Sequence, residues 1–216
     1  MSEDLFADTV TSPGLLVTVD GPNGSGKSTL IAAVHALLER DLPVHCTRQP
    51  SPTPLGDLIR QSEQEYRGRA LAWLIAGDRL AQMENEIIPQ LQVGRVVLCD
   101  RYIESSLVLQ RLDDVPTEEI LHINRGILRP DVRIRLVAQP EVLTRRLATR
   151  PPDAARRFER LPGASERELE LYEDADRLIT GQHQLPATMY DTSTTEAAGL
   201  AERMSEVIRV YRAEHR

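Results

Sequence analysis

One stretch of the chain has the glycine spacing of a nucleotide phosphate-binding loop. Residues 21–28 read GPNGSGKS, which fits the pattern GxxxxGK[ST] in full. The glycines let successive backbone N–H groups converge on one phosphate, and the helix that begins there adds the positive end of its dipole. Lys27 supplies a charge for the β- and γ-phosphates, and the Ser28 hydroxyl is a ligand for Mg²⁺. The predicted nucleotide-binding residues are Gly21, Asn23, Gly24, Ser25, Gly26, Lys27, Ser28 and Thr29.

The context of this loop supports the same prediction. It directly follows the buried apolar run LLVTVD at residues 15–20 and opens an amphipathic segment, as the phosphate-binding geometry requires. A Gly-rich turn with an incidental lysine, which is the alternative, would require neither a buried strand before it nor a helix after it. The sequence therefore predicts a site for ATP or GTP with Mg²⁺, and MgATP is the cofactor that we expect.

A carboxylate closes a second buried run. Asp100 follows VVLC at residues 96–99, and open α/β sheets bind ligands at the carboxyl ends of their strands. Asp100 is thus expected to face the same crevice as the phosphate-binding loop and to hold Mg²⁺ together with Ser28. The alternative is an ion pair that caps the strand end.

Short β-branched or apolar runs alternate with longer amphipathic segments, which indicates an α/β fold with a parallel sheet. We predict a single domain over 14–216, with a three-layer P-loop NTPase fold and a mobile, Pro- and Arg-rich surface loop over about 150–163. Residues 1–13 are expected to form a flexible leader. The predicted strands are 15–20, 44–47, 95–100, 131–138 and 187–191. The predicted helices are 28–40, 55–64, 69–92 with an interruption near Pro89, 103–111, 117–128, 141–149, 166–181 and 194–212.

Composition limits the classes of function. The net charge is −7, from 26 basic and 33 acidic side chains, which argues against a nucleic-acid binder. No apolar run approaches the roughly 20 residues that span a bilayer, and residues 1–13 lack the pattern of a secretory signal. Cys46 and Cys99 are predicted to be buried, reduced thiols inside strands. We therefore expect a cytoplasmic protein with neither a membrane nor a nucleic acid as its partner.

Several segments together resemble the thymidylate kinases, which are P-loop nucleoside-monophosphate kinases. Asp100-Arg101-Tyr102 is similar to the DRY signature of that family, and TRQP at 47–50 is similar to its TREP segment. Asp78-Arg79 matches the family's ADR, and the stretch 105–110 lies where the family has SSxAYQG. The resemblance covers about 15–208, and it implies transfer of the ATP γ-phosphate to a nucleoside monophosphate.

The resemblance also implies roles for individual residues. Arg48 and Arg101 correspond to arginines that hold the acceptor monophosphate, and a planar guanidinium suits that task. Arg79 corresponds to the arginine that contacts the acceptor base. The expected substrate-binding residues are Asp20, Arg48, Ile75, Arg79, Arg101, Ser105, Ser106, Leu109 and Gln110.

The arginine-rich stretch that includes Arg150 and Arg157 corresponds to the family's lid, which closes over ATP. Because the phosphate-binding loop has no arginine, the lid is expected to supply a cation to the transferring phosphoryl group. A solvated basic surface is the alternative interpretation. The expected catalytic residues are Lys27, Asp100, Arg101, Arg150 and Arg157.

The departures from the family pattern gather on the acceptor side. Gln49 stands in place of the Glu of TREP, Ile75 in place of a phenylalanine that stacks on thymine, and Leu109 in place of a tyrosine beside the deoxyribose. Asp20 and Asn23 stand where the family's loop has its acidic residues. The acceptor is therefore dTMP or, given these changes, a modified pyrimidine, another deoxynucleotide or a ribonucleotide.

Two other functions compete with this one. A nucleoside kinase would need a base to deprotonate a 5′-hydroxyl, and Asp20 stands at the right strand end, although two arginines for phosphate argue against a neutral acceptor. A regulatory ATP-binding protein should have lost Lys27 or Asp100, and both are present. The resemblance also implies a homodimer, formed through the helix 69–92 and the helix after Tyr102.

Overall fold

The computed structural model describes residues 4–7, 12–62, 65–149 and 163–215. These residues form one five-stranded sheet in the order β2-β3-β1-β4-β5, in which every neighbouring pair is parallel. The predicted α/β fold is confirmed. The strands are β1 (Leu15–Asp20), β2 (Val44–Arg48), β3 (Val96–Asp100), β4 (Val132–Val137) and β5 (Ala187–Asp191).

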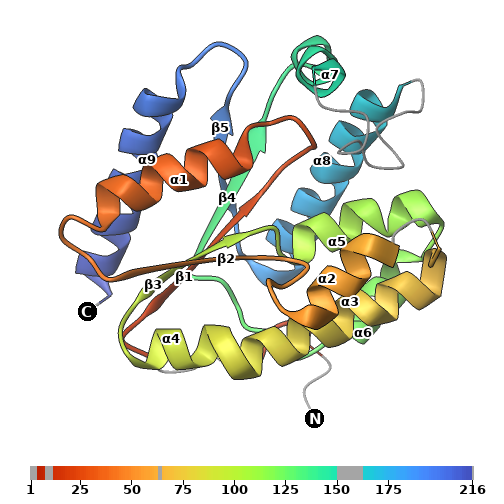
Figure 1. Ribbon diagram of the computed structural model, residues 1–216, viewed down its shortest axis with the longest axis horizontal. Coiled ribbons are helices and arrows are strands. Elements are labelled where there is room, and N and C mark those ends of the chain that lie inside the picture. The colour runs from red at the N-terminus through yellow and green to blue at the C-terminus, as the bar shows by residue number, and fades with distance from the viewer. Residues whose placement is uncertain (1–3, 8–11, 63–64, 150–162, 216) are drawn as a thin grey trace.

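Helices cover both faces of the sheet and give the three layers (Figure 1). The α-helices are α1 (Lys27–Leu38), α2 (Pro54–Ser62), α3 (Gly68–Gln82), α4 (Ile88–Gln92), α5 (Ile103–Leu109), α6 (Thr117–Ile123), α7 (Pro140–Ala148), α8 (Ala164–His183) and α9 (Ala197–Glu214). A π-helical turn, η1 (Met83–Ile87), joins α3 to α4, and a 3₁₀ turn, η2 (Arg111–Asp113), follows α5.

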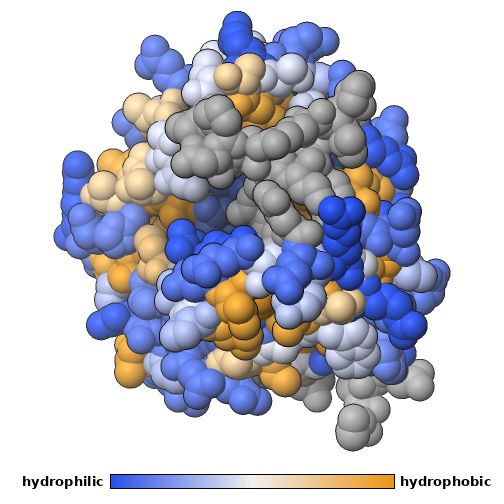
Figure 2. Space-filling model, turned by 45° about the vertical axis from the view of Figure 1, so that its right-hand side comes forward, coloured by the Kyte–Doolittle hydropathy of each residue, from blue (hydrophilic) through white to orange (hydrophobic). Residues whose placement is uncertain are grey.

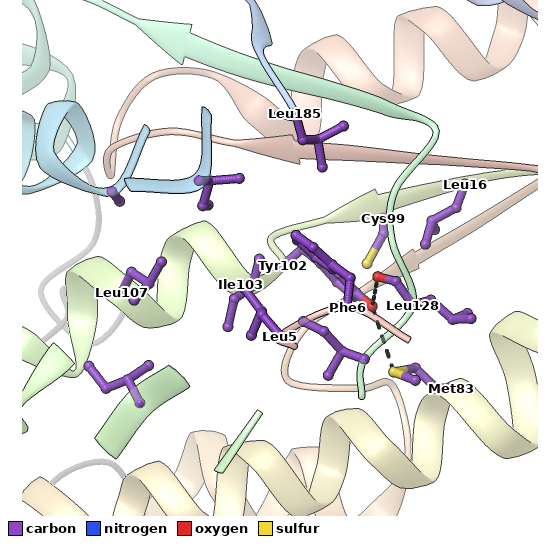
Figure 3. Close-up of a cluster of buried hydrophobic side chains, with 14 of the residues drawn as sticks. Leu5, Phe6, Leu16, Met83, Cys99, Tyr102, Ile103, Leu107, Leu128 and Leu185 are labelled. Atoms are coloured by element: carbon purple, nitrogen blue, oxygen red, sulfur yellow. Dashed lines mark hydrogen bonds between the residues drawn. The ribbon is translucent and has the colours of Figure 1, made fainter. Parts of the chain in front are cut away.

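Each face of the sheet has its own core. Alternate side chains of β1 point to opposite faces, so that Val17 and Val19 pack with α1 and α9 while Leu16 packs with the helices of the other face. Figure 3 shows part of this second core, where Tyr102 lies among Phe6, Met83 and Leu128. The Tyr102 hydroxyl donates to the carbonyl of Leu128 at 3.0 Å. The carboxyl ends of the strands lie outside both cores, and the candidate site described below is located there.

A buried ionic cluster fixes β4 to two helices. Arg133 and Arg135 of β4 point toward α5 and α8, where they contact Glu104 and Asp176. Burial, followed by the charge of Asp20, raises the pKa of Glu104 to about 8, while the two arginines act in the opposite direction. The cluster holds α5 in place, and α5 begins immediately after the DRY segment.

Some predicted boundaries are confirmed and others are wrong, for local reasons. The interruption predicted near Pro89 is present, as a π-helical turn over Met83–Ile87 between α3 and α4. Helix α6 ends at Ile123, since residues 124–126 form a turn instead. Cys46 is exposed, contrary to the prediction, because β2 is an edge strand; Cys99 is buried as predicted.

Residues 4–7, which belong to the predicted leader 1–13, pack against the domain. Phe6 forms an isolated parallel bridge with Ile127, and both Leu5 and Phe6 are buried. The N–H of Ala7 donates to the carbonyl of Ile127 at 2.8 Å. An apolar pair this short has no periodicity for a sequence pattern to detect.

The surface in Figure 2 is largely hydrophilic, and its hydrophobic residues lie in separate patches. None of the helices in the described ranges is long and apolar enough to cross a membrane.

Candidate functional site

The phosphate-binding loop connects β1 to α1 in a conformation that requires glycine. Gly21, Gly24 and Gly26 have φ angles of 146°, 82° and 85°, which residues with a Cβ rarely adopt. A Cβ on Gly21 would also lie 2.6 Å from the carbonyl oxygen of Leu136 on β4. The loop therefore depends on these glycines both for its turn and for its close approach to the sheet.

Lys27 lies folded into this loop. Its Nζ donates to the carbonyl oxygens of Gly21 at 2.7 Å and Pro22 at 2.9 Å, and the residue is only 7% exposed. Burial and, next, the nearby charge of Arg101 lower the pKa of Lys27 to about 7, although Asp100 and Glu168 oppose that shift. A phosphate beside this amine would supply the missing counter-charge.

Asp100 and Ser28 lie together, as the sequence predicts. The Ser28 hydroxyl donates to Asp100 Oδ2 at 3.0 Å, while Asp100 Oδ1 is buried and has no hydrogen-bond partner within the described part of the chain. A hydroxyl with a carboxylate oxygen left unsatisfied is a donor set of hard oxygen atoms, which suits Mg²⁺. The residues present thus fit the expected metal.

Arg101 is held in a left-handed backbone conformation, with φ of 72°. Its guanidinium donates to Asn23 Oδ1 at 2.7 Å, to Ser105 Oγ at 3.1 Å and to the Tyr172 hydroxyl at 3.4 Å. These contacts come from the loop, α5 and α8, so three separate elements aim one side chain at the cavity that it lines.

Asp20 acts as an internal anchor. Its Oδ1 accepts hydrogen bonds from the N–H of Tyr102 at 3.1 Å and from the N–H and hydroxyl of Ser105 at 3.0 and 2.5 Å. The residue is 1% exposed. The carboxylate thus caps the start of α5 and fixes the turn that carries Arg101.

A cavity of about 270 Å³ opens beside the loop. Three arginines converge on it: Arg48 from the end of β2, Arg101, and Arg60 from α2. Its lining residues are Asn23, Gly24, Gly26, Lys27, Ser28, Thr29, Arg48, Gln49, Pro50, Arg60, Asp100 and Arg101. Sequence reasoning missed Arg60. A basic residue on the first helix after the proline-rich loop was the signal that could have found it.

Arg60 is braced toward that cavity. It donates to the carbonyl of Pro50 at 2.5 Å and pairs with Asp57 one turn earlier on α2. The Pro50 carbonyl belongs to the loop that follows β2, so α2 and this loop hold the guanidinium between them.

A second, smaller cavity of about 40 Å³ adjoins the first. It brings together most of the residues that the resemblance assigns to the acceptor, from three different elements. They are Ile75 and Arg79 of α3, Arg101, and Ser105, Ser106, Leu109 and Gln110 of or next to α5, joined by Gln49, Pro50 and Tyr102. Gln49, Pro50 and Arg101 line both cavities, which makes the two one continuous site.

Arg79 lines this second cavity and is 2% exposed. Its Nε donates to Gln49 Oε1 at 2.8 Å and its guanidinium to Ser106 Oγ at 2.6 Å. Further hydrogen bonds reach Asn124 Oδ1 and the Tyr102 carbonyl. The side chain therefore links α3 to α5 and to the turn after α6.

Gln110 lines the same cavity but, unlike Arg79, does not use its side-chain polar atoms in hydrogen bonds to the described part of the chain. It is 3% exposed, yet among the residues that the structure describes neither its amide nitrogen nor its amide oxygen has a hydrogen-bond partner. A buried amide without partners carries a desolvation cost that a ligand would remove.

Helix α8 contributes residues that sequence reasoning missed. The carboxylate of Glu168 accepts the N–H of Asn23 in the phosphate-binding loop, at 3.1 and 3.2 Å, and Tyr172 one turn later contacts Arg101. Both residues are buried, and their spacing of four places them on one face of the helix. Polar residues four positions apart on the buried face of a helix were the sequence signal that could have identified Glu168 and Tyr172.

The predicted lid arginines, Arg150 and Arg157, lie outside the described residues. Of the same basic stretch, Arg146 on α7 is described. It donates to the Gly24 carbonyl at 3.2 Å and to the Thr192 carbonyl at 2.7 Å, and so supports the phosphate-binding loop from behind.

Comparisons with known proteins agree with this geometry. Residues 19–188 match the family model for thymidylate kinase. The chain is 38% identical over 141 residues to a probable thymidylate kinase of Pyrobaculum calidifontis, which covers 63% of this chain and 70% of that protein. It is 34% identical over 145 residues to a probable thymidylate kinase of Staphylothermus marinus, covering 65% and 73%.

A solved structure of thymidylate kinase from Candida albicans has the same fold. It superposes with a TM-score of 0.76 over 96% of both chains, at 18% sequence identity. With the loop, the Asp100–Ser28 pair and the arginine-lined cavity in place, the family match decides the identification. This chain belongs to the thymidylate kinase family.

Proposed function

We propose that this family member transfers the γ-phosphate of ATP to dTMP, giving dTDP and ADP. The observation that carries the proposal is the cavity in which Arg48, Arg60 and Arg101 converge beside Lys27. Several guanidinium groups next to a phosphate-binding loop suit an acceptor that is itself a phosphate.

Two phosphates repel one another, so positioning and cationic neutralisation carry most of the catalysis. Lys27 neutralises charge on the β- and γ-phosphates, and Arg101 holds the acceptor phosphate in line with them. Mg²⁺, held by Ser28 and Asp100, would neutralise the phosphate oxygens and orient ATP. The acceptor oxygen is already ionised, so the reaction needs no general base. Arg150 and Arg157 are proposed to add positive charge from the lid.

Gln110 is proposed to read the base. Its unpartnered amide offers a donor next to an acceptor, which complements the adjacent carbonyl and N–H of a thymine or uracil ring. Ile75 and Leu109 give that ring aliphatic contacts rather than an aromatic platform.

The alternative of a nucleoside kinase has less support. Asp20, the candidate base, is buried and accepts three hydrogen bonds from the start of α5. A carboxylate engaged in this way is poorly placed to take a proton from a sugar hydroxyl.

We also propose a homodimer that forms through α3. Trp73 is 54% exposed, and Leu80, also exposed, lies two turns further along the same face. Gly77 lies between them with open space around it, which would let a second helix approach closely. We expect the protein to act in the cytoplasm.

The test is ATP consumption with a panel of acceptors that contains dTMP, dUMP, dGMP, CMP, UMP and thymidine. We expect dTMP to be used and thymidine to be inert. Turnover of thymidine without turnover of dTMP would favour the nucleoside kinase instead, and no turnover of any acceptor would favour a regulatory ATP-binding protein.

A further inference from the structure

Arg79 is a buried cation whose hydrogen-bond partners are all neutral. Within the described ranges it donates to the side chains of Gln49, Ser106 and Asn124 and to the carbonyl of Tyr102. Buried charges in proteins are normally paired, because removing an ion from water is costly. This guanidinium is desolvated and lacks direct contact with a carboxylate among those partners.

The two nearby carboxylates are committed elsewhere. Asp78, the neighbour of Arg79 on α3, accepts from the N–H of Ser51 at 2.6 Å and from its hydroxyl at 2.5 Å. Asp20 accepts from Tyr102 and Ser105. Both acids act on Arg79 only through space, and burial still lowers the pKa of Arg79 below its usual range. The positive charge is therefore incompletely compensated.

The position of Arg79 says which part of a ligand would meet this charge. Arg79 lines only the second cavity. Arg101 lines both cavities and is the residue proposed to hold the acceptor phosphate. A pyrimidine nucleotide with its phosphate at Arg101 enters this cavity from its sugar side, at N1 of the ring. The C4–C5 edge lies across the ring from N1, so it points away from Arg101 and toward the residues that line only the second cavity, of which Arg79 is one.

We infer that this acceptor pocket prefers, over dTMP, a pyrimidine deoxynucleotide whose base carries an anionic group on its C4–C5 edge. Arg79 supplies the counter-ion and Gln110 holds the neighbouring carbonyl and N–H of the ring. The inference rests on the proposed function, because it assigns the substrate class of the same site. The aliphatic side chains of Ile75 and Leu109 carry no charge that would oppose such a group.

The test compares two acceptors of nearly equal size and shape. They are 5-carboxy-dUMP, which is anionic at C5, and 5-carbamoyl-dUMP, which is neutral there. We expect kcat/KM for the carboxylate to exceed that for the amide by about tenfold or more, as direct contact with a desolvated charge implies. We also expect kcat/KM for the carboxylate to exceed that for dTMP, which is assayed alongside.

A variant then assigns the preference to Arg79. Gln49→Glu places a carboxylate at the position that accepts from Arg79 Nε, so it should neutralise the guanidinium and remove the preference for the carboxylate. Gln92→Glu adds the same charge at an exposed position at the end of α4, and it should leave the ratio unchanged. Thermal unfolding of each variant checks that the protein still folds, and the carboxylate-to-amide ratio of kcat/KM within each variant is the quantity compared.

Each result decides something. Equal kcat/KM values for the carboxylate and the amide in the unmodified protein, with dTMP turned over normally, would overturn this inference and leave the proposed function intact. A preference for the carboxylate that survives Gln49→Glu would overturn the role of Arg79. Absence of turnover with every monophosphate, dTMP included, would instead overturn the proposed function, and this inference with it.

Discussion

The two halves of the site are built by different means. The ATP side is made chiefly of backbone: glycines with positive φ, N–H groups of the loop and the start of α1. The acceptor side is made of side chains from α2, α3 and α5, joined by hydrogen bonds such as those of Arg79. The first cavity has a volume of about 270 Å³, and the second about 40 Å³.

This difference explains where the family pattern is kept and where it changes. A phosphate bound by backbone geometry needs glycines at fixed positions, which leaves little freedom for substitution. A base bound by side chains can be accommodated by many combinations of residues, as Gln49, Ile75 and Leu109 show.

The largest effects are expected where the two halves meet. Lys27→Ala removes the charge at the β- and γ-phosphates, and Arg101→Ala removes the cation that lines both cavities. Each should lower kcat about a thousandfold while the fold survives, because cationic stabilisation is the main source of catalysis in phosphoryl transfer. Steady-state kinetics with dTMP, together with thermal unfolding, measures both parts of this prediction. Near-normal turnover would remove that residue from the mechanism.

Arg60→Ala tests whether α2 belongs to the acceptor side. Since Arg60 lines the first cavity with Arg48 and Arg101, its loss should raise the KM for dTMP by about tenfold, an effect typical of one charged hydrogen bond to phosphate. The KM for ATP should change little. Arg67→Ala, at an exposed position before α3, is the matched control. A rise in the KM for ATP alone would assign Arg60 to the donor side.

Lys27 should make the stability of the nucleotide-free protein depend on pH. Its pKa is lowered to about 7 in the folded state, so between pH 7 and its usual pKa of 10.5 the unfolded chain binds more protons than the folded one. The free energy of unfolding should therefore rise with pH in this window, with a contribution from Lys27 of about 1 kcal/mol per pH unit. Urea unfolding from pH 7 to 9, compared with Lys27→Met, measures this slope. Equal slopes in the two proteins would contradict the prediction.

Ile75→Phe restores an aromatic side chain on the acceptor side and is expected to have the smallest effect. An aromatic platform under the base is worth about 1 kcal/mol or more, so the KM for dTMP should fall about fivefold. Measured beside Ile75→Leu, which keeps an aliphatic side chain, an unchanged KM would show that stacking is not what this pocket lacks.

Much of the fold follows from local patterns. The five strands, the loop at 21–28 and the carboxylate at Asp100 were predictable because buried runs and glycine spacing are properties of short segments. Arg60, Glu168 and Tyr172 were not, since their roles depend on which helices pack beside the loop. The buried cluster of Arg133 and Arg135 was equally hidden, because a strand that alternates arginine with apolar residues reads as half exposed.

Lys27 can be labelled selectively because of the amino-acid composition of the chain. The other 25 basic side chains among the 26 are arginines, so Lys27 is the only lysine in the sequence. Reductive methylation with ¹³C-formaldehyde would therefore label a single side chain, at the phosphate-binding loop. Its NMR signal, free of overlap from other lysines, would report directly on nucleotide arrival and departure.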